Sequence, residues 1–178
     1  MHTPADVMIR SLDAAEAEHH LGELGHVLVD AVAHGASVNY LHGLEQDQAK
    51  AYWHNLLPGI AAGHTHLIVA DNGTRLIGTV LLFLMQQPNQ PHRAEIGKML
   101  VLSTHRRQGI GKRLLVAAEA KARGLGRRLL MLDTTSGSAG DELYRHCGWT
   151  AYGEVPGHAL TVGGEPSNTT FFYKQLPD

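Results

Sequence analysis

The stretch from residue 94 to residue 112 constrains the fold more than any other part of this chain. Residues 99–102 form an apolar run typical of a strand, and residues 106–111, RRQGIG, form a short basic turn with two glycines. Apolar residues then recur at helical spacing: Ile110, Leu114, Ala118 and Ala122. A strand that enters a helix through such a turn presents free backbone N–H groups at the positive end of the helix dipole. The stretch therefore predicts an anion site, most naturally for phosphate.

Two common phosphate motifs do not fit this turn. A Walker A loop needs glycine where Arg106 stands and a serine or threonine where Arg113 stands, so no hydroxyl is present to hold magnesium. A dinucleotide fingerprint needs a third glycine at Leu114, and no acidic strand end follows at the expected distance. A P-loop is excluded, and a nucleotide oxidoreductase is disfavoured.

The remaining pattern, Arg/Gln-x-x-Gly-x-Gly/Ala after a strand, resembles the acyl-CoA loop of the GNAT superfamily of N-acetyltransferases. Residues 143–149, LYRHCGW, resemble the helix-to-strand signature of the same superfamily. The resemblance implies that backbone N–H groups of the turn hold the pyrophosphate of acetyl-CoA, while the strand pairs with the pantetheine arm or the acetyl carbonyl. The implied cofactor-binding residues are Met99, Leu100, Val101, Arg106, Arg107, Gln108, Gly109, Ile110, Gly111 and Lys112.

The order of predicted elements indicates one α/β domain over residues 1–178, a usual domain length. We expect a mixed, mostly antiparallel sheet of about seven strands flanked by about four helices, with two strands splayed at the acetyl-CoA cleft as in the GNAT fold. The expected helices cover residues 13–33, 45–62 and 109–123, with a fourth, short helix carrying Tyr144. The expected strands cover residues 5–12, 66–71, 76–86, 94–102, 128–134, 149–155 and 169–175. Residues 156–167, rich in Gly and Pro, are predicted to form a loop over a substrate.

Charge and composition exclude several kinds of partner. The formal net charge is −2 and the sequence pI is about 6.7, which argues against nucleic acid or an anionic membrane as the main partner. The single cysteine, Cys147, and the lack of a signal-like or membrane-spanning apolar run predict a cytoplasmic protein. His64 and His66 lack companion ligands at metal-binding spacing, so we expect no metal.

Four further segments make the resemblance narrower. They resemble the tabtoxin-resistance acetyltransferases, which acetylate the amine of a β-lactam amino acid toxin. Residues 39–40 and 97–98 depart from that pattern near the expected acceptor pocket, so the segments define the reaction better than the acceptor. The four matching segments are GASV at 35–38, RAE at 93–95, LDT at 132–134 and GEVPG at 153–157.

Acetyl transfer to an amine needs a base, an oxyanion donor and an acid, because a protonated amine cannot attack and the leaving thiolate needs a proton. Glu95 and Asp133 are candidate bases, each matching a carboxylate of the resembled family's active site, and Tyr144 is the acid that the resemblance implies. A strand N–H at or near Met99 is the candidate oxyanion donor. Cys147 has no evident His–acid partner and is interpreted as a core residue.

Each catalytic candidate has a structural alternative. Glu95 could pair with Arg93 or Lys98, Asp133 could cap the following turn, and Tyr144 could simply pack in the core. Three functions compete: an N-acetyltransferase for a small-molecule amine, with a tabtoxin-like acceptor as the narrower form; a protein or peptide N-acetyltransferase; and an acyl-CoA-binding module without turnover. A homodimer that shares the acceptor pocket stays open.

Overall fold

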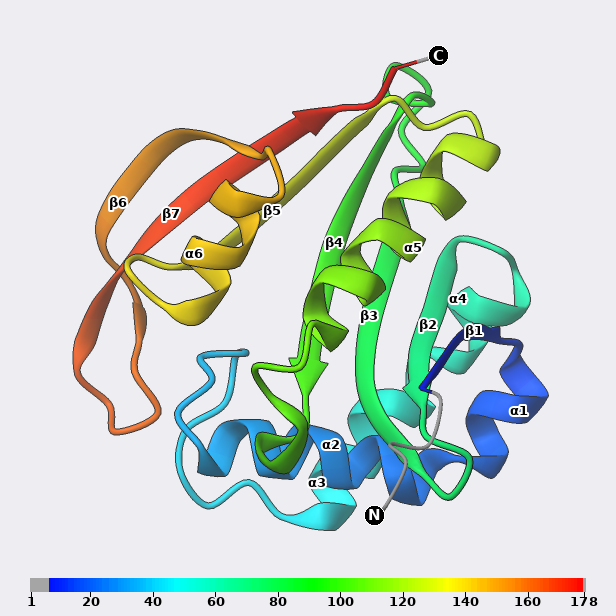
Figure 1. The fold of residues 1–178 in the computed structure, drawn as a ribbon, viewed down its shortest axis with the longest axis vertical. Coiled ribbons are helices and arrows are strands. Elements are labelled where there is room, and N and C mark those ends of the chain that lie inside the picture. The colour runs from blue at the N-terminus through cyan, green and yellow to red at the C-terminus, as the bar shows by residue number, and fades with distance from the viewer. Residues whose placement is uncertain (1–6, 178) are drawn as a thin grey trace.

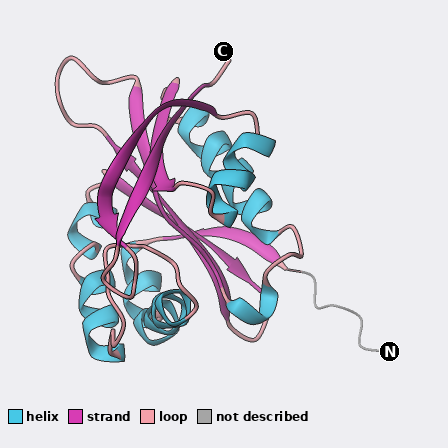
Figure 2. Ribbon diagram, turned by 90° about the vertical axis from the view of Figure 1, so that its left-hand side faces the viewer, coloured by secondary structure: helices cyan, strands magenta, loops and turns pink. Residues whose placement is uncertain are grey.

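The computed structural model describes residues 7–177, which form one seven-stranded, mostly antiparallel sheet with helices on both faces (Figure 1; Figure 2). This is the fold class that the sequence predicts. The sheet order is β1-β2-β3-β4-β5-β7-β6. The strands are β1 (Met8–Leu12), β2 (Thr65–Asp71), β3 (Leu76–Leu84), β4 (Arg93–Val101), β5 (Leu129–Thr135), β6 (Thr150–Leu160) and β7 (Pro166–Gln175).

Two of the expected helices are each divided in two. The first breaks at His20, which is both the C-cap of one helix and the N-cap of the next. The second breaks before Pro58, whose missing N–H is tolerated only in the first turn of a helix. The α-helices of the described residues are α1 (Ala14–His19), α2 (Leu21–Ala33), α3 (Gln46–His54), α4 (Leu57–Ala61), α5 (Ile110–Gly124) and α6 (Ala139–His146), and a 3-10 turn, η1, covers Ser103–His105.

The core lies between the helices and the middle of the sheet. Strand β3 is buried along seven of its nine residues, as expected for a strand covered on both faces. Helix α5 contributes Leu114 and Ala118, and α2 contributes Leu24 and Leu28, all fully buried. Burial of one leucine side chain stabilises the fold by about 2 kcal/mol, so these faces fix both helices against the sheet.

The sheet opens between β4 and β5. The two strands pair in parallel only from Arg93 to Glu95, opposite Leu129 to Met131, and then diverge. Figure 1 shows the resulting V-shaped gap, with β1–β4 on one arm and β5–β7 on the other. The unit β4–α5–β5 is therefore parallel and splayed as predicted, and backbone groups of both strands face the gap.

The prediction of a loop at residues 156–167 is wrong for most of its length. Strand β6 continues to Leu160 and β7 begins at Pro166, so only a short turn joins them. The glycines and prolines indicated a loop, but a register shift between Val155 and Ala159 contains Pro156 and Gly157, and pairing with β7 resumes after it. The tip of this hairpin contacts residues 35–43: His42 N–H donates to the Val162 carbonyl (2.9 Å), which links the two arms of the sheet.

Candidate active site

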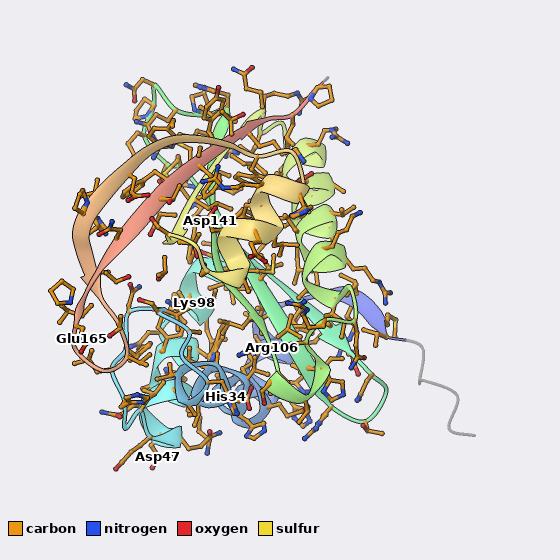
Figure 3. The ribbon with its side chains drawn as sticks, turned by 60° about the vertical axis from the view of Figure 1, so that its left-hand side comes forward. His34, Asp47, Lys98, Arg106, Asp141 and Glu165 are labelled. Carbon is orange, nitrogen blue, oxygen red and sulfur yellow. The ribbon has the colours of Figure 1, made fainter. Side chains whose placement is uncertain are left out.

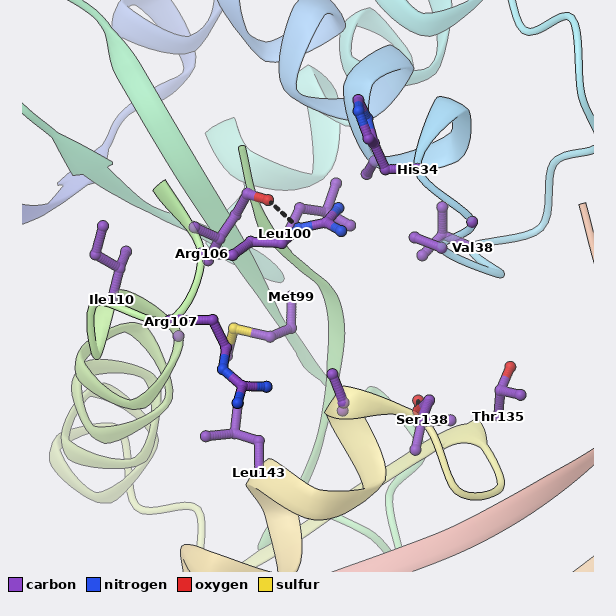
Figure 4. Close-up of a pocket in the computed structure, with 18 of the residues that line it drawn as sticks. His34, Val38, Met99, Leu100, Arg106, Arg107, Ile110, Thr135, Ser138 and Leu143 are labelled. Atoms are coloured by element: carbon purple, nitrogen blue, oxygen red, sulfur yellow. Dashed lines mark hydrogen bonds between the residues drawn. The ribbon is translucent and has the colours of Figure 1, made fainter. Parts of the chain in front are cut away.

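A cavity of about 510 Å³ lies in the gap between the two arms of the sheet, beside the N-terminus of α5 (Figure 4). Its walls come from the end of α2 and the loop after it, from β4, from the start of α5, and from α6. The charged side chains among the described lining residues are basic or histidine: His34, His105, Arg106, Arg107 and Lys112. A site with these charges and no lining carboxylate favours an anion at one end.

The turn before α5 has the backbone shape that the sequence predicts for an anion site. Gly109 is the N-cap of α5 with φ +77°, and Arg107 also has a left-handed φ of +63°. Gly109 supplies no capping side chain, and the first turn of α5 has no acidic residue, so its N–H groups are free for an anion. At Gly111 a Cβ would lie 3.3 Å from the Leu143 side chain, so glycine allows α5 and α6 to approach closely.

The turn is anchored from two sides. Asp30 on α2 accepts two hydrogen bonds from Ser103, one from the backbone N–H and one from the hydroxyl, each 2.7 Å long. Arg106 Nε donates to the Val101 carbonyl at 3.2 Å (Figure 4). These bonds fix the strand-to-helix connection before any ligand binds, which lowers the entropy lost on binding.

Most residues of the predicted cofactor set line this cavity. Gln108 and the candidate bases Glu95 and Asp133 are not among its lining residues, whereas Tyr144 is. The predicted residues that line the cavity are Met99, Leu100, Val101, Arg106, Arg107, Gly109, Ile110, Gly111, Lys112 and Tyr144.

Tyr144 is held rigidly at the cavity wall. It is 6% exposed and packs against Trp149 and Phe172, with ring centroids 5.9 Å and 5.8 Å away. Among residues 7–177 its hydroxyl has no hydrogen-bonding partner, although Tyr144 lines the cavity. Burial raises the pKa of Tyr144 well above its ordinary value, and nearby Asp133 raises it further. The phenol is therefore protonated at neutral pH and able to donate.

Helix α6, which carries Tyr144, is fixed at its N-terminus. Ser138 caps it by accepting from the Asp141 N–H. Asp141 is itself buried, accepts from the Gly137 N–H at 2.8 Å and pairs with Arg145. These contacts hold the phenol at one place relative to β5.

The candidate bases lie in a second group of side chains, the acceptor-side cluster: Glu95, Lys98, Asp133 and His158. Asp133 is exposed on β5, yet neighbouring groups partly desolvate it, and this raises its pKa. His158 lowers that pKa, Glu95 raises it and Lys98 lowers it. Asp133 thus interacts with the other three members and with Tyr144.

Glu95 adopts the structural alternative considered from the sequence. Its carboxylate pairs with Arg93 at 2.6 Å, although 44% of the side chain remains exposed. An exposed ion pair of this kind is worth at most about 1 kcal/mol, so Arg93 does not hold the Glu95 carboxylate firmly. Asp133 forms no hydrogen bond to the turn that follows β5 among the described residues, so capping does not explain it.

Several cavity residues were not predicted as site residues. The apolar character of residues 35–43 indicated that this segment is covered, and residues 35–38 do line the cavity. His34 carries no sequence signal for the site, while Thr134 and Leu143 lie in segments that resemble the family but were not named as site residues; the packing of α2, β5 and α6 brings all three to the cavity. Lys98, which does not line the cavity, was likewise not predicted as a site residue, and its position depends on a distortion of β4.

Across residues 7–177 there is no group of three or more His, Cys, Asp or Glu side chains that could hold a metal ion. None of the helices in that part is long and apolar enough to cross a membrane.

Residues 29–149 match the model of the Acetyltransferase (GNAT) family, which is more than half of the chain. The chain belongs to this family. The match includes the strand, turn and helix of the anion site, together with Glu95, Asp133 and Tyr144. As a GNAT acetyltransferase, the protein is an acyltransferase, and its fold agrees with the sequence prediction.

Solved structures of other acetyltransferases share this fold. An N-acetyltransferase from Staphylococcus aureus Mu50 has a TM-score of 0.78 at 17% identity, covering 97% of this chain and 99% of that chain. A phosphinothricin acetyltransferase from Sinorhizobium meliloti, in complex with acetyl-CoA, has 0.77 at 17%, covering 96% and 88%. A ribosomal-protein-alanine N-acetyltransferase from Brucella melitensis has 0.74 at 20%, covering 95% and 99%. Because these names include a small-molecule and a protein acceptor, the shared fold does not select the acceptor.

Proposed function

We propose that this GNAT acetyltransferase transfers the acetyl group of acetyl-CoA to the amine of a small molecule, with residues 1–178 acting as one domain. The narrower candidate acceptor is a tabtoxin-like β-lactam amino acid, on the resemblance of four sequence segments. The observation that carries the proposal is the continuity of the cavity, which runs from the N-terminus of α5 to Tyr144 at the gap between β4 and β5.

Acetyl-CoA would lie along this cavity with its pyrophosphate at the N–H groups from Arg107 to Lys112. The left-handed residues Arg107 and Gly109 orient these groups, and Lys112 adds a charge. The pantetheine arm would enter the gap beside Met99, where β4 has lost its pairing with β5. A β4 N–H at Met99 would then donate to the thioester carbonyl as negative charge develops on it.

The amine would approach from the acceptor-side cluster and attack the thioester directly. Asp133, whose pKa is raised by burial, would accept the amine proton, and Glu95 would take part directly or through water. Collapse of the tetrahedral intermediate expels the CoA thiolate, and Tyr144 would donate its phenolic proton to the sulfur. The N-acetyl product and free CoA then leave from opposite sides of the gap.

A hydrogen-bonded bridge across one side of the gap supports a small acceptor over a protein. The Ser37 hydroxyl donates to the Leu160 carbonyl (3.2 Å), and His42 donates to Val162, so the β6–β7 hairpin bridges to the 35–43 loop. A peptide chain crossing the site would have to displace this bridge. A binding module without turnover would need neither a base nor an acid, whereas Glu95, Asp133 and Tyr144 are all present in this chain.

CoA release from acetyl-CoA tests this proposal across tabtoxinine-β-lactam, amino acids, polyamines, aminoglycosides and short peptides. Turnover of a small amine, with the acetylated product seen by mass spectrometry, is the expected result. Activity confined to peptides would favour a protein acceptor. Tight acetyl-CoA binding with no turnover of any amine would favour the binding module.

A further inference from the structure

Lys98 lies at a distortion in the middle of β4. The register between β3 and β4 shifts between Thr79 and Leu81, and Lys98 has a left-handed φ of +45°. Such a conformation is unfavourable for a residue with a side chain, so the surrounding structure must hold it. The buried Thr79 hydroxyl does so by donating to the Lys98 carbonyl at 2.9 Å. A bulge redirects a side chain, and here it turns Lys98 toward the 35–43 loop.

The ammonium group of Lys98 is only partly satisfied by its surroundings. It donates to the Val38 carbonyl at 3.0 Å and lies 4.9 Å from the centroid of the Tyr52 ring and 6.0 Å from that of Tyr40. An ammonium has three donors, and among the described residues no carboxylate lies within ion-pair distance of this one. Burial lowers the pKa of Lys98, and Asp133 partly restores it, so the group is a largely desolvated cation with a carboxylate near enough to act on it.

The acceptor-side cluster therefore separates two kinds of charge. Asp133 and Glu95 stand on β5 and β4 where the strands diverge, and Lys98 reaches from β4 toward the 35–43 loop (Figure 3). An acceptor whose only polar group is its amine would need only the two carboxylates for recognition. A partly buried lysine beside these carboxylates has unused donors that suit an anionic oxygen on the acceptor itself.

We propose that Lys98 is the anion-binding residue of the acceptor site, and that the acceptor is a compact amine that also carries a carboxylate or another oxyanion. This inference rests on the proposed acetyl transfer to a small-molecule amine. The amine of such an acceptor faces Asp133 and Glu95 while its oxyanion accepts from Lys98 Nζ. The bridge between the 35–43 loop and the β6–β7 hairpin keeps the two groups of the acceptor close together.

The test compares amino acids with their own primary amides, which keep the amine and side chain but lose the carboxylate. The wild-type protein is expected to prefer the acid by about tenfold or more in kcat/KM, the scale of one charge-assisted hydrogen bond. Lys98→Met should remove this preference by raising KM for the acid far more than KM for the amide. Lys98→Arg, which keeps the charge, should retain part of the preference.

Lys50→Met serves as the matched control, because Lys50 lies on the exposed side of α3 and pairs only loosely with Asp47 at 3.9 Å. Thermal melting of all variants shows whether each one folds. If Lys98→Met lowers acid and amide turnover equally, Lys98 only holds the 35–43 loop and the inference is wrong. A wild type that acetylates amides or polyamines as well as acids also overturns it, while leaving the proposed acetyl transfer intact.

Absence of turnover on every amine would instead contradict the proposed function. Binding of an acceptor oxyanion by Lys98 is then measured by calorimetric titration of amino acids and their amides into the CoA-bound protein. Binding of acids but not amides, lost in Lys98→Met, supports the inference without catalysis. Equal or absent binding of both rejects it.

Discussion

Substitution of Gly109 tests the anion site at the start of α5. Gly109 has φ +77° and a Cβ there would meet no atom within 4 Å, so a side chain fits in space but strains the backbone. This strain costs roughly 1–2 kcal/mol for most residues and less for asparagine and aspartate. Gly109→Asn and Gly109→Asp have nearly the same shape, so their difference isolates the effect of one negative charge at the turn.

The expected magnitude follows from Coulomb's law. A carboxylate about 6 Å from a phosphate charge, at an effective dielectric of about 40, is repelled by roughly 1.4 kcal/mol. Two charges of a pyrophosphate give about 2.8 kcal/mol, which is about a hundredfold in Kd. We therefore expect Gly109→Asp to bind CoA about a hundredfold more weakly than Gly109→Asn. This difference in Kd should become smaller at high salt.

Calorimetric titration with CoA measures this difference, and thermal melting measures the strain. Gly73→Asp is the matched control, because Gly73 has φ +84° and equally open surroundings but lies in the β2–β3 turn. It should lose similar stability and keep CoA affinity. Equal Kd values for Gly109→Asn and Gly109→Asp would refute the assignment of the pyrophosphate to this turn.

Three further predictions concern the chemistry and the frame of the site. Tyr144→Phe should lower kcat about a hundredfold or more in steady-state CoA release. CoA affinity and melting temperature should change little, because the hydroxyl has no partner among the described residues. An unchanged kcat would remove Tyr144 as the acid. Because burial raises the pKa of Asp133, its ionisation opposes folding as pH rises above the ordinary pKa of an aspartate, and the penalty is complete once pH exceeds the raised pKa. Asp133→Asn should therefore be slower yet at least as stable as the wild type at pH 7, with the stability difference shrinking in acid; a variant markedly less stable at pH 7 would contradict this. Asp30→Ala should lower the free energy of unfolding by about 1–3 kcal/mol in urea titrations, because Ser103 loses two hydrogen bonds. The same change should weaken CoA binding. An unaltered CoA affinity would show that the turn does not need this anchor.

The sequence predicts well those features that depend on local patterns. The strand, turn and helix around Gly109 need only apolar spacing, two glycines and a helix start, and all three are local. The sheet with its divergent β4 and β5 also agrees with the expectation from the resemblance. The prediction for residues 156–167 fails because glycine and proline report local flexibility, while pairing with β7 depends on a distant strand.

The acceptor side of the site depends on tertiary structure and is less accessible from sequence. Lys98 acquires its direction from a bulge that Thr79 stabilises from the neighbouring strand, and no local pattern indicates that bond. The coupling of Asp133 to His158 similarly requires the β6–β7 hairpin to fold over β5. Glu95 and Asp133 were found as candidate bases, but their roles remain proposals.

A crystal structure with bound acetyl-CoA tests the central claim most directly. The account predicts the pyrophosphate at the N–H groups from Arg107 to Lys112 and the thioester in the gap between β4 and β5. The acetyl carbonyl should then face the Met99 N–H, and the sulfur should lie within hydrogen-bonding distance of the Tyr144 hydroxyl. A thioester that lies outside the gap, or a sulfur far from Tyr144 with the acetyl group turned away from Asp133, would contradict it.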